Sequence, residues 1–465
     1  MNELDRRKFI KKTALTSIAI GASSLFYNCE SRAALGTSVG VYMGDYKAKK
    51  IKNIRAAFIG VGARGGNHLK FFAGLNGTEV VAISDLYQDK VEEKIIWVRE
   101  VSDSKRHTNI KSYWGDENQW KIMLNEVKPD VVFIATNWSN HAPMAIECMN
   151  KGGHVFVEVP LAVTINDLWK IVDASERTKK HCMMMENVNY GREELMYLNM
   201  CRQGVLGELL HAEAAYIHEL RFQMKEEQRG TGSWRTNHYA KGKGNLYPTH
   251  GLGPVAQYMN LAREEDNFKS LVSYSSPAIG RKIYAEKNYP SEHKWNKLDY
   301  KNGDMNTSII KTYLGRTIML QWDETSPRPY TRHNLIQGSK GVLAGFPTRI
   351  ALEDGFEGIT KDHHQWIQGE KLEKVYKKYD HPLYKKLNKK FKDSGHGGMD
   401  GIMMYRIVEC LQKGEALDQN VYEGCFWSAV TELTGRSIEQ DGAPQKFPDF
   451  TRGKWKRTSP LGVIQ

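Results

Sequence analysis

The sequence predicts an α/β fold, with an N-terminal Rossmann domain followed by an α+β domain that carries a large open, mainly antiparallel sheet. Three observations predict it. An apolar, β-branched run at 54–59 leads directly into a glycine-rich turn; strands and helices then alternate to about residue 190; and segments beyond about 205 alternate in polarity between turn residues. Alternating strands and helices are typical of a parallel sheet, whereas consecutive strands joined by turns are typical of an antiparallel sheet.

The glycine-rich turn reads Gly60-Val61-Gly62-Ala63-Arg64-Gly65, and it begins a helix that extends to about Leu75. A second strand, at 79–83, completes a βαβ unit that ends at Asp85. In such a unit a pyrophosphate binds at the helix N-terminus, and a carboxylate about 20 residues later binds the ribose hydroxyls. An acidic residue at this position would repel a 2′-phosphate, so the sequence favours NAD over NADP. The alternative is a glycine-rich turn in an α/β domain that binds no nucleotide.

The remainder of the first domain continues the alternation. Helices are predicted at 90–100, 114–127, 143–151 and 165–178, and strands at 130–135, 154–157 and 182–185. The polar segment Thr136 to His141 follows the strand at 130–135. Ligands bind at the carboxyl ends of strands in open parallel sheets, so we expect this segment to contact the cofactor; the alternative is a helix cap.

Beyond about residue 205 the predicted strands are 209–216, 306–313, 316–322 and 341–344, and the last predicted helices are 398–413 and 422–440. Packing of these late helices back on the first domain is one option. The sequence thus divides into a targeting segment at 1–30, a linker at 31–50, an NAD-binding Rossmann domain at 51–190 and a substrate-binding domain at 191–465.

The targeting segment begins with Arg6-Arg7 ahead of a short, modestly apolar stretch, Thr13 to Phe26. A twin arginine in this position is typical of a Tat export signal, and the stretch is too short to span a membrane. We therefore expect a periplasmic protein that is exported after folding. Cys29 is a candidate lipid anchor, although the residues before it, Leu25 to Asn28, form a poor lipobox.

The composition of the chain limits the kinds of partner that it is expected to bind. The 465 residues carry a formal charge of +12, but the basic residues are spread along the chain, and the densest run, Lys371 to Lys392, is interleaved with tyrosines. This pattern indicates a solvated face rather than a nucleic-acid site, with a polyanionic partner as the alternative. The other five cysteines are scattered without metal-ligand spacing, which indicates core residues: Cys148, Cys182, Cys201, Cys410 and Cys425.

Two neighbouring stretches concentrate chemically useful side chains: Trp234 to Tyr239, which includes Arg235, and Asn245 to Gly251, which includes Tyr247 and His250. We expect a loop region that forms a sugar pocket, because arginine and tyrosine bond hydroxyls, aromatic faces stack on sugar rings, and histidine moves protons. His250 is the best acid/base candidate. The alternative is a loop whose aromatic residues anchor it to the core, with His250 as a cap or core residue.

Other candidates are weaker. Tyr216 precedes His218-Glu219 at a strand end, and Gly395 to Asp400 begins a late helix, either as a substrate-side loop or as an N-terminal cap. His218, Glu219, His250 and His396 could ligate a metal, but no HExxH-type spacing supports one, so no metal is expected.

The motifs resemble known families. The turn with Asp85, together with Glu158-Val159-Pro160 and Glu186-Asn187, resembles the Gfo/Idh/MocA oxidoreductases. Dehydrogenases of that family usually have Glu-Lys-Pro, whose lysine assists proton transfer, and Val159 replaces it here. The sequence is more closely similar to glycoside hydrolase family 109, the NAD-dependent α-N-acetylgalactosaminidases, through WRTNHY (234–239), LYPTHG (246–251), RPY (328–330), YDHPLYKK (379–386), GHGGMD (395–400) and PDFTRGKWK (448–456).

This resemblance implies two sets of contacts. Those to NAD would be made by Gly60, Gly62, Ala63, Arg64, Gly65, Asp85, Trp138, Ser139, Asn140, His141, Glu158, Val159, Asn187 and Tyr247. Those to the sugar of a glycan would be made by Tyr216, Arg235, Tyr247, Pro248, Thr249, His250 and Tyr330.

The resemblance also implies a mechanism: oxidation at C3 of the sugar, elimination across C1 and C2, addition of water and re-reduction, with His250 and Tyr247 as the catalytic pair. Glycosidases of this kind are exceptions to the scheme with two carboxylates. Two other functions stay open at this stage, an exported NAD(P)-dependent sugar dehydrogenase and a non-catalytic sugar-binding protein that holds NAD. The sequence does not determine the sugar, the anomer, the aglycone or whether the chain forms a homo-oligomer.

Overall fold

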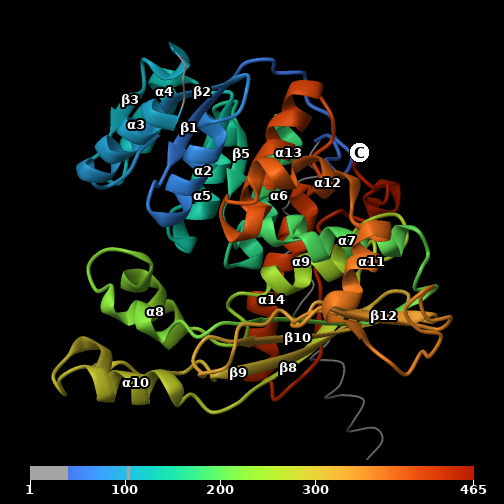
Figure 1. Ribbon diagram of the computed structural model, residues 1–465. Helices are drawn as coiled ribbons and strands as arrows, with labels where there is room; N and C mark the ends of the chain where they lie inside the picture. Colours follow the sequence, from blue (N-terminus) through green and yellow to red (C-terminus); the bar gives the residue numbers. More distant parts are fainter. Residues whose placement is uncertain (1–39, 102–104) are drawn as a thin grey trace, which may run out of the picture. The chain divides into compact units, whose positions relative to one another are not determined.

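The computed structural model describes residues 40–101 and 105–465. Within them the first sheet has six parallel strands in the order β3-β2-β1-β4-β5-β6 (Figure 1). The strands are β1 (Ile54–Ile59), β2 (Thr78–Ser84), β3 (Lys111–Tyr113), β4 (Val131–Ile134), β5 (His154–Val157) and β6 (Cys182–Met184). The predicted export signal and Cys29 lie outside the described residues.

Five helices alternate with these strands: α2 (Ala63–Ala73), α3 (Gln88–Val101), α4 (Gln119–Val127), α5 (Trp138–Asn150) and α6 (Ile165–Thr178). Strands β4 and β5 are buried along their whole length, which explains their uninterrupted apolar runs. The prediction began α5 at Pro143, a common place for a proline. The helix instead begins at Trp138, because the Asn137 side chain accepts a hydrogen bond from the Asn140 N–H and caps it.

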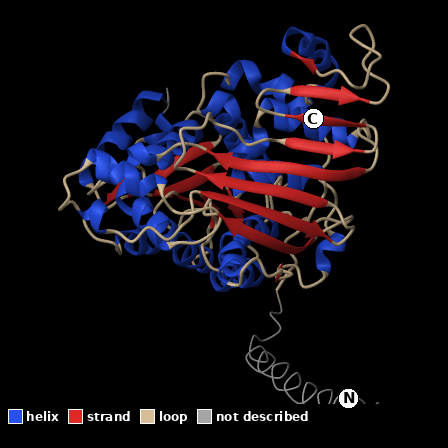
Figure 2. Cartoon of the chain, turned by 90° about the horizontal axis from the view of Figure 1, so that it is seen from below, coloured by secondary structure: helices blue, strands red, loops and turns tan. Residues whose placement is uncertain are grey.

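The second sheet has nine strands within the described residues, in the order β14-β13-β12-β11-β7-β10-β9-β8-β15. They are β7 (Leu209–Ile217), β8 (Phe268–Ser275), β9 (Met305–Thr312), β10 (Thr317–Asp323), β11 (Leu335–Gly338), β12 (Gly341–Ala344), β13 (Arg349–Leu352), β14 (Ile367–Gln368) and β15 (Gln445–Lys446). Strands β7 and β10 pair in parallel and the other pairs are antiparallel, as the sequence predicts for most of the sheet. Figure 2 shows the sheet with helices behind it.

Several helices of the second domain have no counterpart in the sequence prediction: α7 (Arg192–Arg202), α8 (Thr231–Lys241), α9 (Thr249–Tyr258), α10 (Gly280–Asn288), α11 (Leu372–Tyr379) and α12 (Pro382–Phe391). The prediction of a loop at Trp234 to Tyr239 is wrong, because that stretch lies in α8. Glycines before and after this stretch suggested a loop, but they lie at the two ends of the helix. Residues 371–392 form α11 and α12, whose tyrosines and leucines face the core while the lysines face solvent.

The late helices α13 (Met399–Lys413) and α14 (Val421–Glu439) both pack on elements of the first domain, within residues 41–465, which form one compact unit. Helix α13 packs on α2, with Ile407 in the same apolar core as Phe58 and Phe72. Helix α14 packs between α6 and β8. No helix in the described part of the chain is both long enough and apolar enough to cross a bilayer.

Candidate active site

The glycine-rich turn after β1 is shaped for a pyrophosphate. Gly60 has φ of +80°, and a Cβ on Gly65 would lie 1.8 Å from the Gly60 carbonyl oxygen, so neither position tolerates a side chain. A Cβ on Gly62 would meet no described atom within 4 Å. Gly62 is the N-cap of α2, and no described side chain caps the N–H groups of the first turn. An open glycine beside uncapped N–H groups suits an anion, so these residues fit the phosphates of a dinucleotide.

Asp85 lies just beyond β2, beside this turn. Its Oδ2 accepts a hydrogen bond from the Val61 N–H at 2.8 Å, and its Oδ1 accepts one from the Tyr87 N–H at 3.1 Å. The carboxylate is therefore fixed against the glycine-rich turn, where it can also accept from ribose hydroxyls.

Arg64, in the first turn of α2, joins the two domains. It donates to Glu158 Oε1 at 3.0 Å and to both carboxylate oxygens of Asp400 in α13, at 2.9 and 3.2 Å. Burial alone would raise the pKa of Glu158, but Arg64 and the hydrogen bond from His68 outweigh burial and lower it. Both carboxylates therefore stay ionised and hold the arginine.

The same Asp400 organises two further residues. Its Oδ2 lies 2.8 Å from Nδ1 of His396, and its Oδ1 accepts from the Asn187 side-chain amide at 2.6 Å. Burial would raise the pKa of Asp400, but the bond from His396 and the charge of Arg64 lower it. The His396 side chain is 56% exposed while Asp400 is fully buried, so the imidazole is held at one nitrogen and free toward solvent.

His250 is held in the same way at the start of α9. Its Nδ1 lies 2.6 Å from Oε1 of Glu186, whose side chain is fully buried, and the His250 side chain is 15% exposed. A carboxylate accepts hydrogen bonds, so this contact places the imidazole hydrogen on Nδ1 and leaves Nε2 able to take a proton. This is the orientation that a general base requires.

Aromatic rings surround His250. Tyr247 stacks on Tyr216 with ring centroids 4.6 Å apart, and both rings meet the imidazole edge-on, at 4.9 and 5.3 Å. Tyr330, 38% exposed, lies edge-on to Tyr216. Burial raises the pKa of Tyr247, so its phenol stays a hydrogen-bond donor at neutral pH.

Arg235 completes this group from α8. Its guanidinium lies 5.0 Å from the ring centre of Trp138 and 5.4 Å from that of Tyr247. Burial would lower the pKa of Arg235, but Tyr239, Tyr247 and Glu324 raise it, so the side chain remains a cation. The structure therefore brings Tyr216, Arg235, Tyr247, His250 and Tyr330 together, as predicted for sugar contacts.

The other predicted contact residues differ in their exposure to solvent. His141 is fully buried, and its two ring nitrogens face the carbonyl oxygens of Pro160 and Thr136. Val159 and Thr249 are 3% and 1% exposed. Pro248 is buried at the N-cap of α9, and Ser139 is exposed in the first turn of α5. Their contacts with cofactor or sugar stay predictions.

A groove of about 820 Å³ lies beside this site, between the start of α5, α8 and α14. Trp138 and Leu246 line it, and the Trp138 ring also lies 6.0 Å from the Tyr247 ring and 5.0 Å from the Arg235 guanidinium. Ser139 and Asn137 also line this groove.

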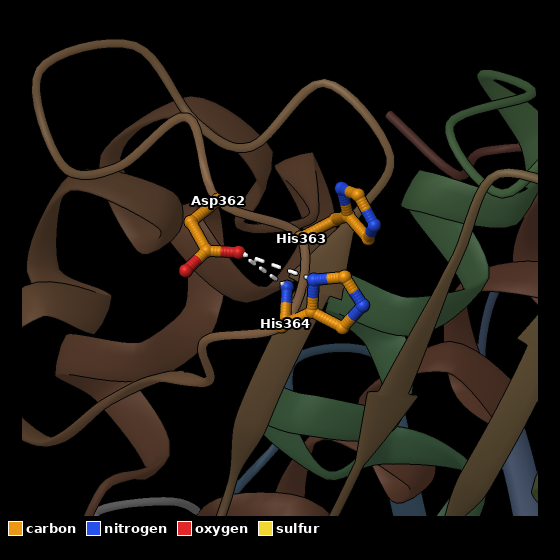
Figure 3. A group of neighbouring side chains, drawn as sticks. All are labelled: Asp362, His363 and His364. Carbon is orange, nitrogen blue, oxygen red and sulfur yellow. Dashed lines mark hydrogen bonds and ion pairs between the residues drawn. The ribbon is translucent and has the colours of Figure 1, made fainter.

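One group with the spacing of metal ligands exists in the described part of the chain, Asp362, His363 and His364, all exposed on the loop before β14 (Figure 3). Asp362 Oδ1 accepts from the His364 N–H at 2.9 Å and so organises its own turn. This group includes none of the histidines around the candidate site.

Two acids that hold residues of the candidate site were not predicted from the sequence, Glu186 and Asp400. Glu186 was noted only as part of a family motif, and Asp400 only as the end of GHGGMD. A buried acid one residue after a predicted strand, and an acid in the first turn of a helix after a glycine-rich loop, are signals that could have suggested them.

The fold and the site define a class: a two-domain protein with a dinucleotide-binding Rossmann domain, whose second domain brings together a carboxylate-bound histidine and a set of aromatic rings. Residues 54–186 match the model of the oxidoreductase family with an NAD-binding Rossmann fold, and residues 190–457 match that of the glycosyl hydrolase 109 C-terminal domain. The chain belongs to glycoside hydrolase family 109, and its cofactor is NAD.

Relatives of the same family are similar to this chain over its full length. The chain is 53% identical over 487 residues to glycosyl hydrolase family 109 protein 1 of Akkermansia muciniphila, with all of both chains covered. It is 50% identical over 466 residues to the alpha-N-acetylgalactosaminidase of Shewanella oneidensis, again with both chains fully covered. Among solved structures, levoglucosan dehydrogenase in complex with NADH and levoglucosan has a TM-score of 0.63 at 16% identity, covering 85% of this chain and all of that one, which shows the shared fold.

Proposed function

We propose that the chain is an exported glycosidase that removes terminal α-linked N-acetylgalactosamine from glycans and keeps NAD bound throughout. The observation that carries the proposal is the Glu186–His250 pair, at 2.6 Å, beside the stacked Tyr216 and Tyr247 rings. It provides an oriented base next to aromatic faces suited to a sugar ring. The name of the Shewanella oneidensis relative supports the choice of sugar.

The chemistry that NAD supplies when bound is a reversible oxidation at C3 of the sugar, which makes the hydrogen at C2 acidic. Gly60, Gly62 and Asp85 would hold its phosphates and ribose, as their geometry indicates. His250 takes up the proton that leaves C2 at its Nε2 atom, and Glu186 stabilises the resulting imidazolium cation. Tyr247, which stays protonated, donates a hydrogen bond to a sugar oxygen.

After the proton leaves C2, the glycosidic oxygen leaves C1, and water then adds at C1. A second group that moves protons serves these steps, and His396 has the required setting, with Nδ1 held by buried Asp400 and the ring exposed. His396 Nδ1 also lies 3.3 Å from Nη1 of Arg64, in the first turn of α2 beside the glycine-rich turn. Two histidines, each oriented by a buried carboxylate, therefore divide the proton transfers.

The test is a panel of chromogenic glycosides on the purified protein, with the nucleotide identified by mass spectrometry after acid release. We expect cleavage of the α-N-acetylgalactosaminide, one NAD for each chain and no accumulation of NADH. Steady accumulation of NADH from free sugar would indicate a sugar dehydrogenase instead. Sugar binding without turnover of any glycoside would indicate a binding protein.

Export to the periplasm is part of the proposal, supported by Arg6-Arg7 and the short apolar stretch that follows. Tat export moves folded proteins, so the chain would carry its NAD with it. Replacing both arginines with lysine should leave the protein in the cytoplasm. Unchanged export of that variant would rule out this route, and mass spectrometry of the mature N-terminus would show whether Cys29 carries a lipid.

A further inference from the structure

A segment of the second domain contacts the Rossmann domain at two separate points. We call residues 226–241, which include α8, the strap. At one point Trp234 and His238 lie against Trp138, with ring centroids 5.1 and 5.5 Å away. At the other point Arg229 contacts Tyr87 and Asp89, just beyond β2.

These two points lie on opposite sides of the glycine-rich turn. Trp138 follows β4 and Tyr87 follows β2, and β1, which leads into the turn, lies between those strands in the sheet. Figure 1 shows α8 between the Rossmann domain and α10. The strap therefore crosses the carboxyl edge of the sheet where a dinucleotide binds.

The Arg229 contact is at the adenosine end of that edge. Asp85, the expected ribose ligand, is followed by two exposed side chains with apolar surface, Leu86 at 54% and Tyr87 at 38%. The Arg229 guanidinium lies 4.0 Å from the centre of the Tyr87 ring, and its Nη2 lies 3.0 and 2.9 Å from the two carboxylate oxygens of Asp89. Exposed apolar groups beside a ribose site suit the flat face of an adenine.

We propose that Arg229 is a latch: by binding Tyr87 and Asp89 it closes the strap over the adenosine end of NAD and slows release of the cofactor. The inference concerns cofactor retention alone, so it does not depend on which sugar the enzyme cleaves. Retention has a clear use for an enzyme that must complete oxidation and reduction with one cofactor molecule.

The strap is braced independently of the latch. Glu226 accepts a hydrogen bond from the Gly232 N–H at 2.7 Å, and the Glu227 carboxylate lies 3.0 Å from Nε2 of His293. The Glu227 carbonyl oxygen accepts from Lys294 Nζ at 3.0 Å. Loss of the Arg229 side chain should therefore open one contact without unfolding the loop.

The test measures how fast the cofactor leaves the full-length protein. Wild type and Arg229→Ala are loaded with NADH and mixed with a large excess of NAD, and the decay of bound NADH fluorescence gives the dissociation rate. Because a partly exposed cation–π contact and a partly exposed ion pair are each weak, we expect Arg229→Ala to release NADH roughly 3- to 30-fold faster. Asp89→Ala should give part of this increase, and the double variant should release no faster than Arg229→Ala alone.

The matched control is Lys225→Ala, which removes an exposed cation just before the strap that lies 5.9 Å from the Phe222 ring. It should leave the dissociation rate unchanged, and all variants should keep the melting temperature of the NAD-free protein. The inference is overturned if Arg229→Ala and Asp89→Ala release NADH within twofold of wild type. It is also overturned if Lys225→Ala accelerates NADH release as much as Arg229→Ala does. The faster release would then come from the loss of any positive charge there, or from a looser loop.

Discussion

Replacement of Glu186 by glutamine isolates the orientation of the proposed base. The Glu186 carboxylate is fully buried and lies 2.6 Å from His250 Nδ1. Glutamine keeps the size and one acceptor oxygen but removes the charge that stabilises the imidazole when it takes a proton. The amide can also present its N–H₂ group to Nδ1, which would place the imidazole hydrogen on the wrong nitrogen.

The size of the effect follows from the type of contact. A hydrogen bond to a charged group contributes about 1.5–3 kcal/mol, and about 1.4 kcal/mol corresponds to a tenfold change in rate. Glu186→Gln should therefore lower kcat roughly 10- to 150-fold. NAD should remain bound, because Glu186 contacts neither the glycine-rich turn nor Asp85 in the described contacts.

The assay is kcat on a chromogenic α-N-acetylgalactosaminide, with NAD occupancy measured on the same sample. Glu176→Gln is the matched control, because Glu176 is 2% exposed and its carboxylate accepts from Tyr422 at 2.6 Å, in the packing between α6 and α14. The control should lose about 1–3 kcal/mol of unfolding free energy and keep its kcat. A wild-type kcat in Glu186→Gln at full occupancy, or an equal loss in both variants, would refute the role of Glu186.

Four more predictions follow from the proposed site and its chemistry. His250→Ala should lower the rate roughly 100-fold or more with NAD still bound. Product that the wild type forms in D2O should carry deuterium at C2. Normal turnover without that deuterium would contradict the elimination unless the base were shielded from solvent. Asp85→Ala should weaken NAD retention more than it lowers the melting temperature, because its carboxylate, which accepts from the Val61 N–H at 2.8 Å, is expected also to accept from the ribose hydroxyls. Equal NAD content in both proteins would argue against the ribose contact. The pKa of Asp400 is lowered in the folded state, where the His396 bond and the Arg64 charge outweigh burial. The stability that Asp400 contributes is therefore present above the unfolded pKa of about 4 and is lost as the pH falls toward the folded pKa. Calorimetry from pH 3 to 7 should show that Asp400→Asn loses less stability on acidification than wild type, and parallel curves would exclude this contribution.

Much of the first domain could be predicted because its signals are local. The turn from Gly60 to Gly65, the apolar strands and Asp85 lie within about 30 residues, and steric and hydrogen-bond rules relate them directly. Strand β5 and helix α6 were predicted with their bounds as observed. In the second domain four strands, β7, β9, β10 and β12, were predicted from their polarity pattern, whereas β8, β11, β13, β14 and β15 were not. Helix α8 was predicted as a loop because its composition is mixed and glycines lie on either side of it.

The sequence by itself determined the family resemblance, the cofactor class and the candidate base His250, because each depends on residue types at fixed spacing. Only the tertiary structure decided which acids serve them. Glu186 and His250 are 64 positions apart, and Arg64 and Asp400 are 336 apart, yet each pair is in contact. The physical reason is that an ion pair is specified by the packing of whole elements, here α13 on α2 and α9 beside the end of β6, and such packing has no local pattern in the chain.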